Sequence, residues 1–292
     1  MRIALVNDGD RSWLGLVDAA GESIRELRIP EGRSGDLAID FIQSTSVDAK
    51  PDVIGPPLAL NTLQLMPPVR RPGKNIICVG KNYRAHAAEF TGSGYDSSAT
   101  NASDIIPEAP ILFSKAPSCL IGATDDVVVP WELTTEIDYE AELGLVIGKT
   151  GRNISVDSAY DYVWGYTVIN DVTARDLQSR HKQWLLGKSI DTFCPMGPFL
   201  VSANDIDPEN LELSCWVNSE LRQQANTRDL IFDIPSIISA ASASMTLEPG
   251  DIIATGTPAG VGIGFQPPRF LQKNDVVEVT IEGIGTIRNR IT

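Results

Sequence analysis

Two glutamates lie one residue apart at the head of an apolar run, EIDYEAELGLVIGK, residues 136–149. Alternate side chains of an extended strand point to the same face, so Glu140 and Glu142 are expected to project together. Carboxylates this close repel each other where water is excluded, and each raises the pKa of the other unless a cation or a shared proton offsets the repulsion. The pattern therefore indicates either a cation site or a solvated strand face.

A third carboxylate, Asp171, ends the following β-like run in YTVINDVTARDLQ. Three carboxylates brought together by neighbouring strands are typical of sites for Mg²⁺ or Mn²⁺, which prefer oxygen ligands and keep positions for water and substrate. Neither His nor Cys occurs in these two segments, which disfavours zinc. The sequence thus predicts a hard-cation site, with a solvated strand as the alternative.

One of the two histidines, His86, lies in KNYRAHAAEF, and Glu89 follows three residues later. On a helix these two side chains share a face and can form a hydrogen bond. A carboxylate behind an imidazole orients the ring and stabilises its protonated form, as a general base that activates water requires. A chance pair on a surface helix is the alternative.

Two further segments contain groups that could stabilise negative charge. Lys188 follows a glycine in GKSIDTFCPMGP, and the glycine-rich stretch IIATGTPAGVGIG comes directly after a β-like run. Backbone N–H groups of such a turn can point at a carboxylate or enolate oxygen, and a lysine can offset the charge of metal ligands or of an intermediate. An ordinary turn and an ordinary surface lysine are equally compatible with these residues.

The elements that must position these residues are mostly strands. Short apolar runs separated by turns predict a small N-terminal sheet, followed by a helix near DLAIDFIQ and by six prolines between Pro51 and Pro72. This composition suits an extended connector, so we predict a small N-terminal α+β domain over residues 1–70 and a larger domain over residues 71–292. Beyond residue 70, short apolar runs predict strands, so the fold class is α+β and predominantly β. Short helices are expected around YRAHAAEF, DSAYDYV, TARDLQSRH and IPSIISAASAS.

Composition excludes several classes of function. The chain has 24 basic and 38 acidic residues, a net charge of −14, and no Lys/Arg-rich block, so nucleic acid and anionic membranes are poor candidate partners. It contains neither G-x-G-x-x-G nor a Walker motif. The four cysteines form no C-x-x-C pair, the first residues lack the apolar core of a signal peptide, and no apolar run is long enough to span a membrane. These features predict a reduced, cytoplasmic protein.

Six segments in fixed order resemble the fumarylacetoacetate hydrolase family: ICVGKNYRAHAAE, DYEAELGLVIGK, GYTVINDVTARDLQ, GKSIDTFCPMGP, NSELRQQANTRDLIFDI and LEPGDIIATGTPAGVG. The resemblance runs from about residue 74 to the last residue. It implies the mixed β-sandwich roll of that family, preceded by a small N-terminal β-rich domain, and a homodimer that acts on a small 2-oxo acid.

The resemblance also implies roles for individual residues. Mg²⁺ or Mn²⁺ is expected at Glu140, Glu142 and Asp171, and a water-activating pair at His86 and Glu89. Lys188 corresponds to the catalytic lysine of the family. The expected substrate-binding residues are Arg175, Gln178 and Thr257. All of the residues that these motifs require are present.

The predicted reaction is metal-dependent hydrolysis of the C–C bond of an acylpyruvate-like 2,4-dioxo acid, with water activated by the His–Glu pair. The same enolate forms when oxaloacetate loses CO₂ and when a 2-oxo acid tautomerises, so oxaloacetate decarboxylase and keto–enol tautomerase or isomerase remain alternatives. A role in a secondary-metabolite pathway and a binding-only protein are further alternatives, although a binding-only protein has no chemical need for a complete set of acids and base.

A few residues lie outside these motifs. The segment 91–110 is rich in Ser, Gly and Asn and longer than expected for small substrates, which suggests either a lid over a larger acyl group or a surface insertion. Trp164, Trp184 and Trp216 are expected to anchor the core or a dimer interface, and His181 is expected at the surface.

Overall fold

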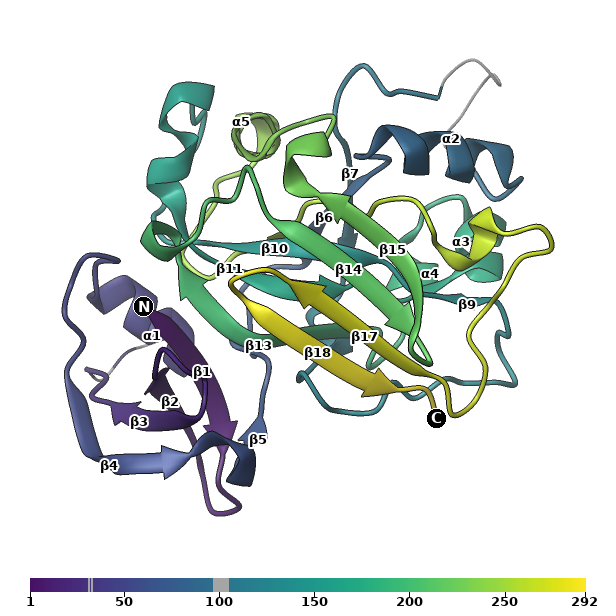
Figure 1. The fold of residues 1–292 in the computed structure, drawn as a ribbon. Coiled ribbons are helices and arrows are strands. Elements are labelled where there is room, and N and C mark those ends of the chain that lie inside the picture. Colours follow the sequence, from purple (N-terminus) through teal and green to yellow (C-terminus); the bar gives the residue numbers. More distant parts are fainter. Residues whose placement is uncertain (31, 33, 97–104) are drawn as a thin grey trace.

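Two β-sheets packed against each other form most of the molecule in the computed structural model (Figure 1). The structure describes residues 1–292 except 31, 33 and 97–104. Within this described part, twelve strands form a mixed sheet that runs β4-β3-β2-β1-β13-β11-β10-β16-β6-β7, with β5 paired to β1 and β8 to β13. A four-stranded sheet, β15-β14-β17-β18, packs across β10, β11 and β13. The predicted fold class, α+β with a predominantly β sandwich, is confirmed.

The strands of the large sheet are β1 (Arg2–Asn7), β2 (Ser12–Val17), β3 (Ser23–Leu27), β4 (Val53–Ala59), β5 (Gln64–Leu65), β6 (Ile76–Gly80), β7 (Ile111–Lys115), β8 (Leu120–Ile121), β10 (Ala141–Ile147), β11 (Val163–Asn170), β13 (Cys194–Ser202) and β16 (Ile252–Ala254). The smaller sheet comprises β14 (Glu212–Val217), β15 (Glu220–Asn226), β17 (Val276–Ile281) and β18 (Gly285–Arg290), and a separate pair joins β9 (Ile137–Asp138) to β12 (Thr173–Ala174). The α-helices are α1 (Leu37–Ser44), α2 (Arg84–Gly92), α3 (Arg175–His181), α4 (Leu185–Lys188) and α5 (Ile234–Ser244).

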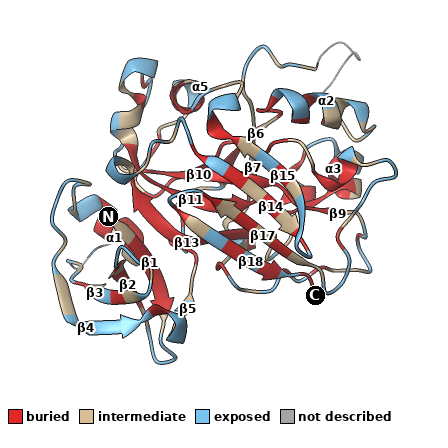
Figure 2. Cartoon of the chain, in the orientation of Figure 1, coloured by how far each residue is buried: buried red, intermediate tan, exposed pale blue. Residues whose placement is uncertain are grey.

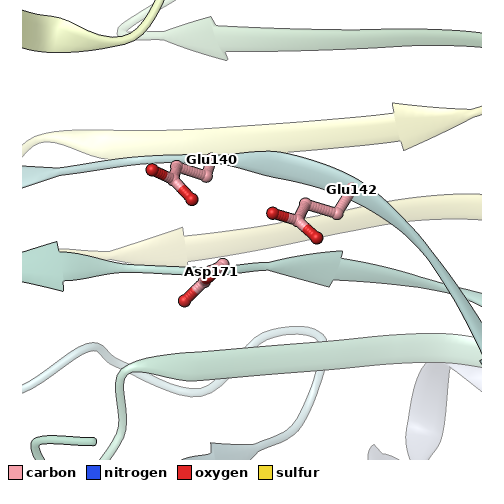
Figure 3. Close-up of side chains that lie close together, drawn as sticks. All are labelled: Glu140, Glu142 and Asp171. Carbon is pink, nitrogen blue, oxygen red and sulfur yellow. The ribbon is translucent and has the colours of Figure 1, made fainter. Parts of the chain in front are cut away.

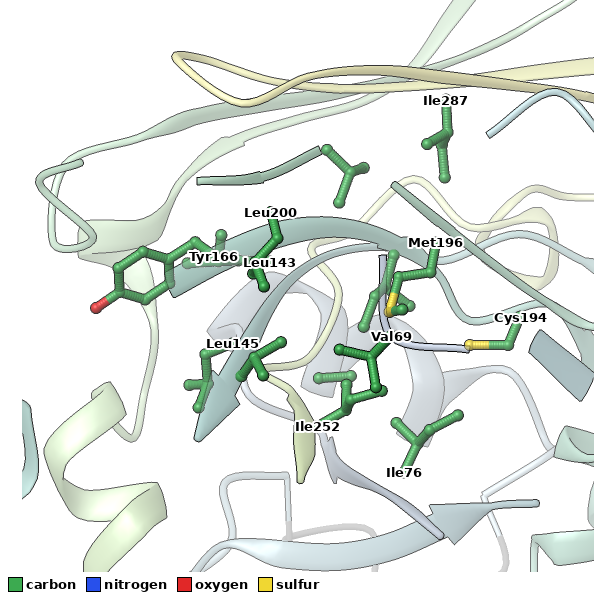
Figure 4. Packing of buried hydrophobic residues seen from close by; sticks show 14 of the residues in the cluster. Val69, Ile76, Leu143, Leu145, Tyr166, Cys194, Met196, Leu200, Ile252 and Ile287 are labelled. Carbon is green, nitrogen blue, oxygen red and sulfur yellow. The ribbon is translucent and has the colours of Figure 1, made fainter. Parts of the chain in front are cut away.

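Strands β10 and β11 lie at the centre of the molecule and are buried along their whole lengths (Figure 2). Apart from Glu142, Thr167 and Asn170, their residues are aliphatic, aromatic or glycine, as expected for strands that are covered on both faces. Figure 4 shows Leu143 and Leu145 of β10 packed near Tyr166 of β11 and Met196 of β13. This packing fixes the backbone from which the predicted metal ligands project.

The N-terminal strands extend the large sheet. β1 pairs antiparallel with β13, with Arg2 opposite Val201 and Ile3 opposite Leu200. The buried Asp36 caps α1 and also accepts hydrogen bonds from the backbone N–H groups of Arg70 and Arg71. The connector is therefore tied to the first helix, and the domain boundary near residue 70 remains a prediction.

Three strands of seven or more residues were not predicted as such, β4, β13 and β15. β13 contains Pro195 and Pro198, and proline cannot donate to a strand ladder. The register between β11 and β13 shifts between Tyr166 and Val168, beside Pro198, and Pro195 lies opposite Ile121 of the short strand β8. The proline-rich β4 is the edge strand of the sheet, where a missing donor is tolerated. Within the described residues, no helix combines the length and apolar character needed to cross a bilayer.

Candidate active site

The three predicted metal ligands meet at one end of β10 and β11 (Figure 3). Glu140 directly precedes β10, Glu142 lies within it, and Asp171 directly follows β11. The backbone N–H of Asp171 donates to the carbonyl of Glu140 at 2.9 Å, which extends the ladder between the two strands. One carboxylate oxygen from each residue lies within 4.8 Å of the others, and all three residues are buried. The sequence prediction that these carboxylates form a cluster is therefore confirmed.

The three carboxylates have different electrostatic surroundings. Lys188 Nζ lies 2.7 Å from Glu140 Oε2 and 2.8 Å from Asp171 Oδ2. Burial opposes ionisation of Glu140, but the charges of Lys188 and Arg175 outweigh it and lower its pKa to about 2. Burial, with the negative charges of Asp171 and Glu140, raises the pKa of Glu142 well above its ordinary value. Glu142 is therefore the carboxylate that most lacks a positive partner.

Two more buried cations hold this cluster in place. Lys115 Nζ on β7 lies 2.7 Å from Asp171 Oδ1. Arg175 at the start of α3 pairs through Nε with Asp138 Oδ2 at 2.9 Å and through Nη2 with Glu140 Oε1 at 2.7 Å. Burial works against the charged forms of both cations, yet the nearby carboxylates raise the pKa of each. Asp138 is itself fully buried, so its ionic partner is required.

These residues fit a divalent cation. Glu142 is buried and accepts a hydrogen bond from the N–H of Gly256 at 2.8 Å, and no basic side chain of the described residues forms an ion pair with it. Buried oxygens left this short of donors are the groups that a cation would satisfy. The donor set consists of oxygens alone, which suits Mg²⁺ or Mn²⁺ rather than zinc. The chain can therefore hold a divalent ion at Glu140, Glu142 and Asp171.

His86 and Glu89 lie on α2 as the sequence predicted. Nδ1 of His86 is 3.3 Å from Glu89 Oε2, and His86 is buried in the wall of the pocket. Glu89 also accepts the backbone N–H of Gly260 at 3.0 Å. Because a carboxylate accepts, the hydrogen belongs on Nδ1 and leaves Nε2 of the ring as a proton acceptor. This is the arrangement that a general base needs.

The glycine-rich turn after β16 binds the carboxylates of the protein itself. Gly256 has a φ of +100°, and a Cβ there would lie 2.7 Å from Cβ of Asn82, so the position requires glycine. Three N–H groups of the turn donate to three carboxylates of the site: Gly256 to Glu142 at 2.8 Å, Gly260 to Glu89 at 3.0 Å and Gly262 to Asp138 at 2.6 Å. These donors therefore position protein carboxylates, whereas the sequence had also allowed them to bind an enolate.

Thr257 and Gln178 present polar groups to the same pocket. Thr257 Oγ1 accepts a hydrogen bond from Gln223 Nε2 at 2.9 Å, which leaves the threonine hydrogen as a donor. Gln178 Oε1 accepts from Arg175 Nη1 at 3.0 Å, which leaves the amide hydrogens of Gln178 as donors. Both side chains can therefore donate to an anionic ligand.

The pocket collects most of the predicted site residues, namely His86, Glu140, Glu142, Arg175, Gln178, Lys188 and Thr257. Glu89 and Asp171 stand behind this lining and contact it through His86 and Lys188. The structure thus brings all nine predicted site residues together, and their individual roles remain proposals.

Sequence reasoning missed several residues of this region. Phe90, Phe113 and Trp184 line the pocket, although Trp184 was expected in the core or at an interface. Lys115 and Gln223 were not singled out, and a lysine that ends a predicted strand in ILFSK was the one available signal for Lys115.

Other residues outside the motifs have clear positions. Trp164 is buried and packs edge-on against Phe41 at 6.0 Å, which confirms its core position. Trp216 is half-buried on β14, and His181 is exposed as predicted. Residues 97–104 of the segment suggested as a lid lie outside the described part of the chain.

Comparisons with known proteins agree with this geometry. The family described as fumarylacetoacetate (FAA) hydrolase C-terminal matches residues 75–292. Oxaloacetate tautomerase YisK of Bacillus subtilis is 52% identical over 234 residues, which cover 80% of this chain and 74% of that protein.

Two solved structures cover the whole chain. A fumarylacetoacetate hydrolase from Exiguobacterium antarcticum is 37% identical, with a TM-score of 0.85, and the match covers 100% of this chain and 99% of that one. A 5-carboxymethyl-2-hydroxymuconate delta-isomerase from Mycobacterium smegmatis is 31% identical, with a TM-score of 0.79 and the same coverage. The chain is an enzyme of the fumarylacetoacetate hydrolase family.

Proposed function

We propose that this enzyme catalyses the keto–enol tautomerisation of a short 2-oxo dicarboxylic acid of the oxaloacetate type, with a divalent ion held by Glu140, Glu142 and Asp171. The observation that carries the proposal is the placement of an oriented histidine base and three buried carboxylates around one small pocket. The 52% identity to an oxaloacetate tautomerase supports this reaction above the C–C hydrolysis that the sequence first suggested.

The reaction moves one proton from C3 of the substrate and places one on the oxygen at C2. A bound divalent ion would polarise the 2-oxo group and make the C3 proton more acidic. Nε2 of His86 accepts the proton from C3, and Glu89 stabilises the imidazolium that results. The imidazolium then gives this proton to the enolate oxygen at C2, which forms the enol and restores the neutral base. Microscopic reversal of the same steps returns the enol to the keto form.

Lys188 is placed to serve the oxygen at C2. Its ammonium group has three hydrogens, and two of them donate to Glu140 and Asp171. The third can donate to the substrate oxygen on which negative charge develops. Thr257 donates to the carboxylate at C1, while Arg175 and Gln178 place positive charge and amide hydrogens at the same wall.

Hydrolysis of an acylpyruvate is the second candidate. It is favoured by the similarity to a solved fumarylacetoacetate hydrolase and by the His86–Glu89 pair, which could equally deprotonate a water molecule. Decarboxylation of oxaloacetate would pass through the same enolate. The reactions therefore differ in the bond that breaks. Tautomerisation breaks a C–H bond at C3, whereas hydrolysis and decarboxylation break the C3–C4 bond.

The test follows the enol absorbance of oxaloacetate with Mg²⁺, with Mn²⁺ and with a chelator, and measures pyruvate in the same samples. Tautomerase activity predicts metal-dependent acceleration of keto–enol equilibration without release of pyruvate. Acetylpyruvate serves as the parallel substrate, and its metal-dependent cleavage to pyruvate would support hydrolysis. Equal rates with and without enzyme in all of these assays would refute the proposed function.

We further infer a homodimer in a reducing compartment such as the cytoplasm. Leu133, Leu185 and Leu186 are more than 40% exposed, which suits residues that a second copy covers. All four cysteines are buried and free, as expected where thiols stay reduced. Light scattering of the purified protein tests the dimer, and a monomer at micromolar concentration would contradict it.

A further inference from the structure

One wall of the pocket consists of aromatic rings. Trp184 packs edge-on against Phe90, with ring centroids 5.7 Å apart, and against Phe113, with centroids 5.0 Å apart. All three side chains line the pocket, and Phe90 stacks on the ring of His86 at 6.0 Å. The wall therefore adjoins the proposed base.

Backbone geometry holds the indole in this position. Gly80 ends β6, and a Cβ built there would lie 2.7 Å from Cζ3 of Trp184. Glycine at this position lets the indole lie directly against the strand. Trp184 is 8% exposed, so the ring is packed rather than free in solvent. Its place in the wall is therefore set by the fold.

The aromatic wall stands close to the charged floor of the pocket. Nζ of Lys188 lies 5.0 Å from the ring centre of Phe113, and Cζ of Arg175 lies 5.7 Å from that of Phe90. The side chains leave a free volume of about 10 Å³ between wall and floor, which is room for about one water molecule.

We propose that Trp184, supported by Phe90 and Phe113, sets the upper limit on substrate length and restricts this site to short 2-oxo acids. The inference rests on the proposed function in one respect, that the carboxylate and 2-oxo group bind at the charged floor. The rest of the ligand must then extend toward the indole. A substrate chain much longer than that of oxaloacetate would collide with the indole of Trp184. Ile111 and Phe270 pack against the same aromatic cluster, so removal of the indole would open an apolar space.

The test measures binding rather than turnover. Isothermal titration calorimetry with Mg²⁺-loaded protein compares straight-chain 2-oxo acids of increasing length, from 2-oxobutanoate to 2-oxooctanoate. Wild type should bind 2-oxooctanoate at least tenfold more weakly than 2-oxobutanoate. Trp184→Ala should reverse the order, with about fourfold tighter binding for each methylene that enters the vacated apolar space. Trp184→Phe should lie between the two.

Trp216→Ala is the matched control, because Trp216 is half-buried on β14 and does not line the pocket. It should leave the length preference unchanged. If Trp184→Ala proves unfolded by circular dichroism, Phe113→Leu shortens the same wall and should relax the preference in the same direction. Wild type that binds 2-oxooctanoate as tightly as 2-oxobutanoate, or folded wall variants with an unaltered length profile, would overturn the inference.

The two proposals can fail separately. If wild type binds short 2-oxo acids with the predicted length limit but does not accelerate tautomerisation, the proposed reaction is wrong and the length limit stands. If wild type tautomerises oxaloacetate and also binds long acids tightly, the length limit is wrong and the reaction stands. A pocket that binds no 2-oxo acid in the presence of Mg²⁺ or Mn²⁺ would refute both.

Discussion

The side chain of Gln223 controls which way the hydroxyl hydrogen of Thr257 can point. Oε1 accepts from the backbone N–H of Ala141 at 3.0 Å, and Nε2 donates to the carbonyl of Pro258 at 2.8 Å and to Thr257 Oγ1 at 2.9 Å. A backbone N–H can only donate and a carbonyl can only accept, so these two groups fix the orientation of the amide. Thr257 is then an acceptor toward Gln223, and its own hydrogen is directed elsewhere, to the substrate carboxylate in our proposal.

Gln223→Glu replaces the donor Nε2 by an acceptor oxygen with little change in the shape of the side chain. The oxygen that replaces Nε2 faces the carbonyl of Pro258, and the hydroxyl of Thr257 turns its hydrogen toward the new carboxyl group. A hydrogen bond to a charged group contributes about 1.5–3 kcal/mol, so its loss should lower kcat/KM by about 10- to 100-fold. An unpaired buried carbonyl costs about 1–3 kcal/mol, which should lower Tm by several degrees.

Steady-state kinetics on four variants separate positioning from a general loss of structure. Thr257→Val should lose the same factor in kcat/KM as Gln223→Glu, the double variant should lose no more than either, and Thr257→Ser should stay near wild type. Scanning calorimetry shows which fraction is folded. Losses that multiply in the double variant, or a Gln223→Glu enzyme with unchanged kcat/KM, would refute the reasoning.

Three further predictions concern the charged floor. Glu142→Gln should weaken Mg²⁺ binding by about 100-fold or more, because the loss of a residue that only supports a metal ligand already costs about 10- to 100-fold in metal affinity. Calorimetric titration with Mg²⁺ measures this change, and Glu132→Gln, at an exposed position, is the control. His86→Ala should lower kcat by about 10²–10⁴-fold and leave Mg²⁺ affinity unchanged, so weaker metal binding would contradict its role as base. Lys188→Met removes one partner of a buried ionic cluster and should lower the free energy of unfolding of the metal-free protein by about 3–5 kcal/mol. Mg²⁺ should then raise the Tm of this variant more than that of wild type. An equal rise in Tm would contradict the proposed balance of charge.

Local patterns were sufficient to predict the metal ligands. The alternation of Glu140 and Glu142 depends only on the two-residue period of a strand, and the His86–Glu89 pair depends only on the helical spacing of three. Both geometries hold in the structure. The order of the motifs added Arg175, Gln178 and Thr257, which no local pattern had singled out.

Long-range packing determined what the sequence did not reveal. The sequence predicts a core position for Trp184 because indole is mostly apolar, and only the folded structure shows that its ring lines the pocket. Gln223 occupies a polar position in a strand, and its proposed function depends on hydrogen-bond partners that lie 34 to 82 residues away in the chain. The role of Lys115 also depends on a distant residue, because Lys115 ends β7 and its partner Asp171 follows β11.

The balance of charge explains how this site can fold before it binds a metal ion. Four buried carboxylates, Glu140, Glu142, Asp171 and Asp138, face three buried cations, Lys115, Lys188 and Arg175. The cations keep the carboxylates close together at a tolerable cost, because a buried charge without a partner is strongly destabilising. Among the described residues, no basic side chain forms an ion pair with the fourth carboxylate, Glu142, and burial together with the charges of Asp171 and Glu140 raises its pKa. A divalent ion would therefore enter a site whose ligands already lie in place, with the missing charge located beside the base and the aromatic wall.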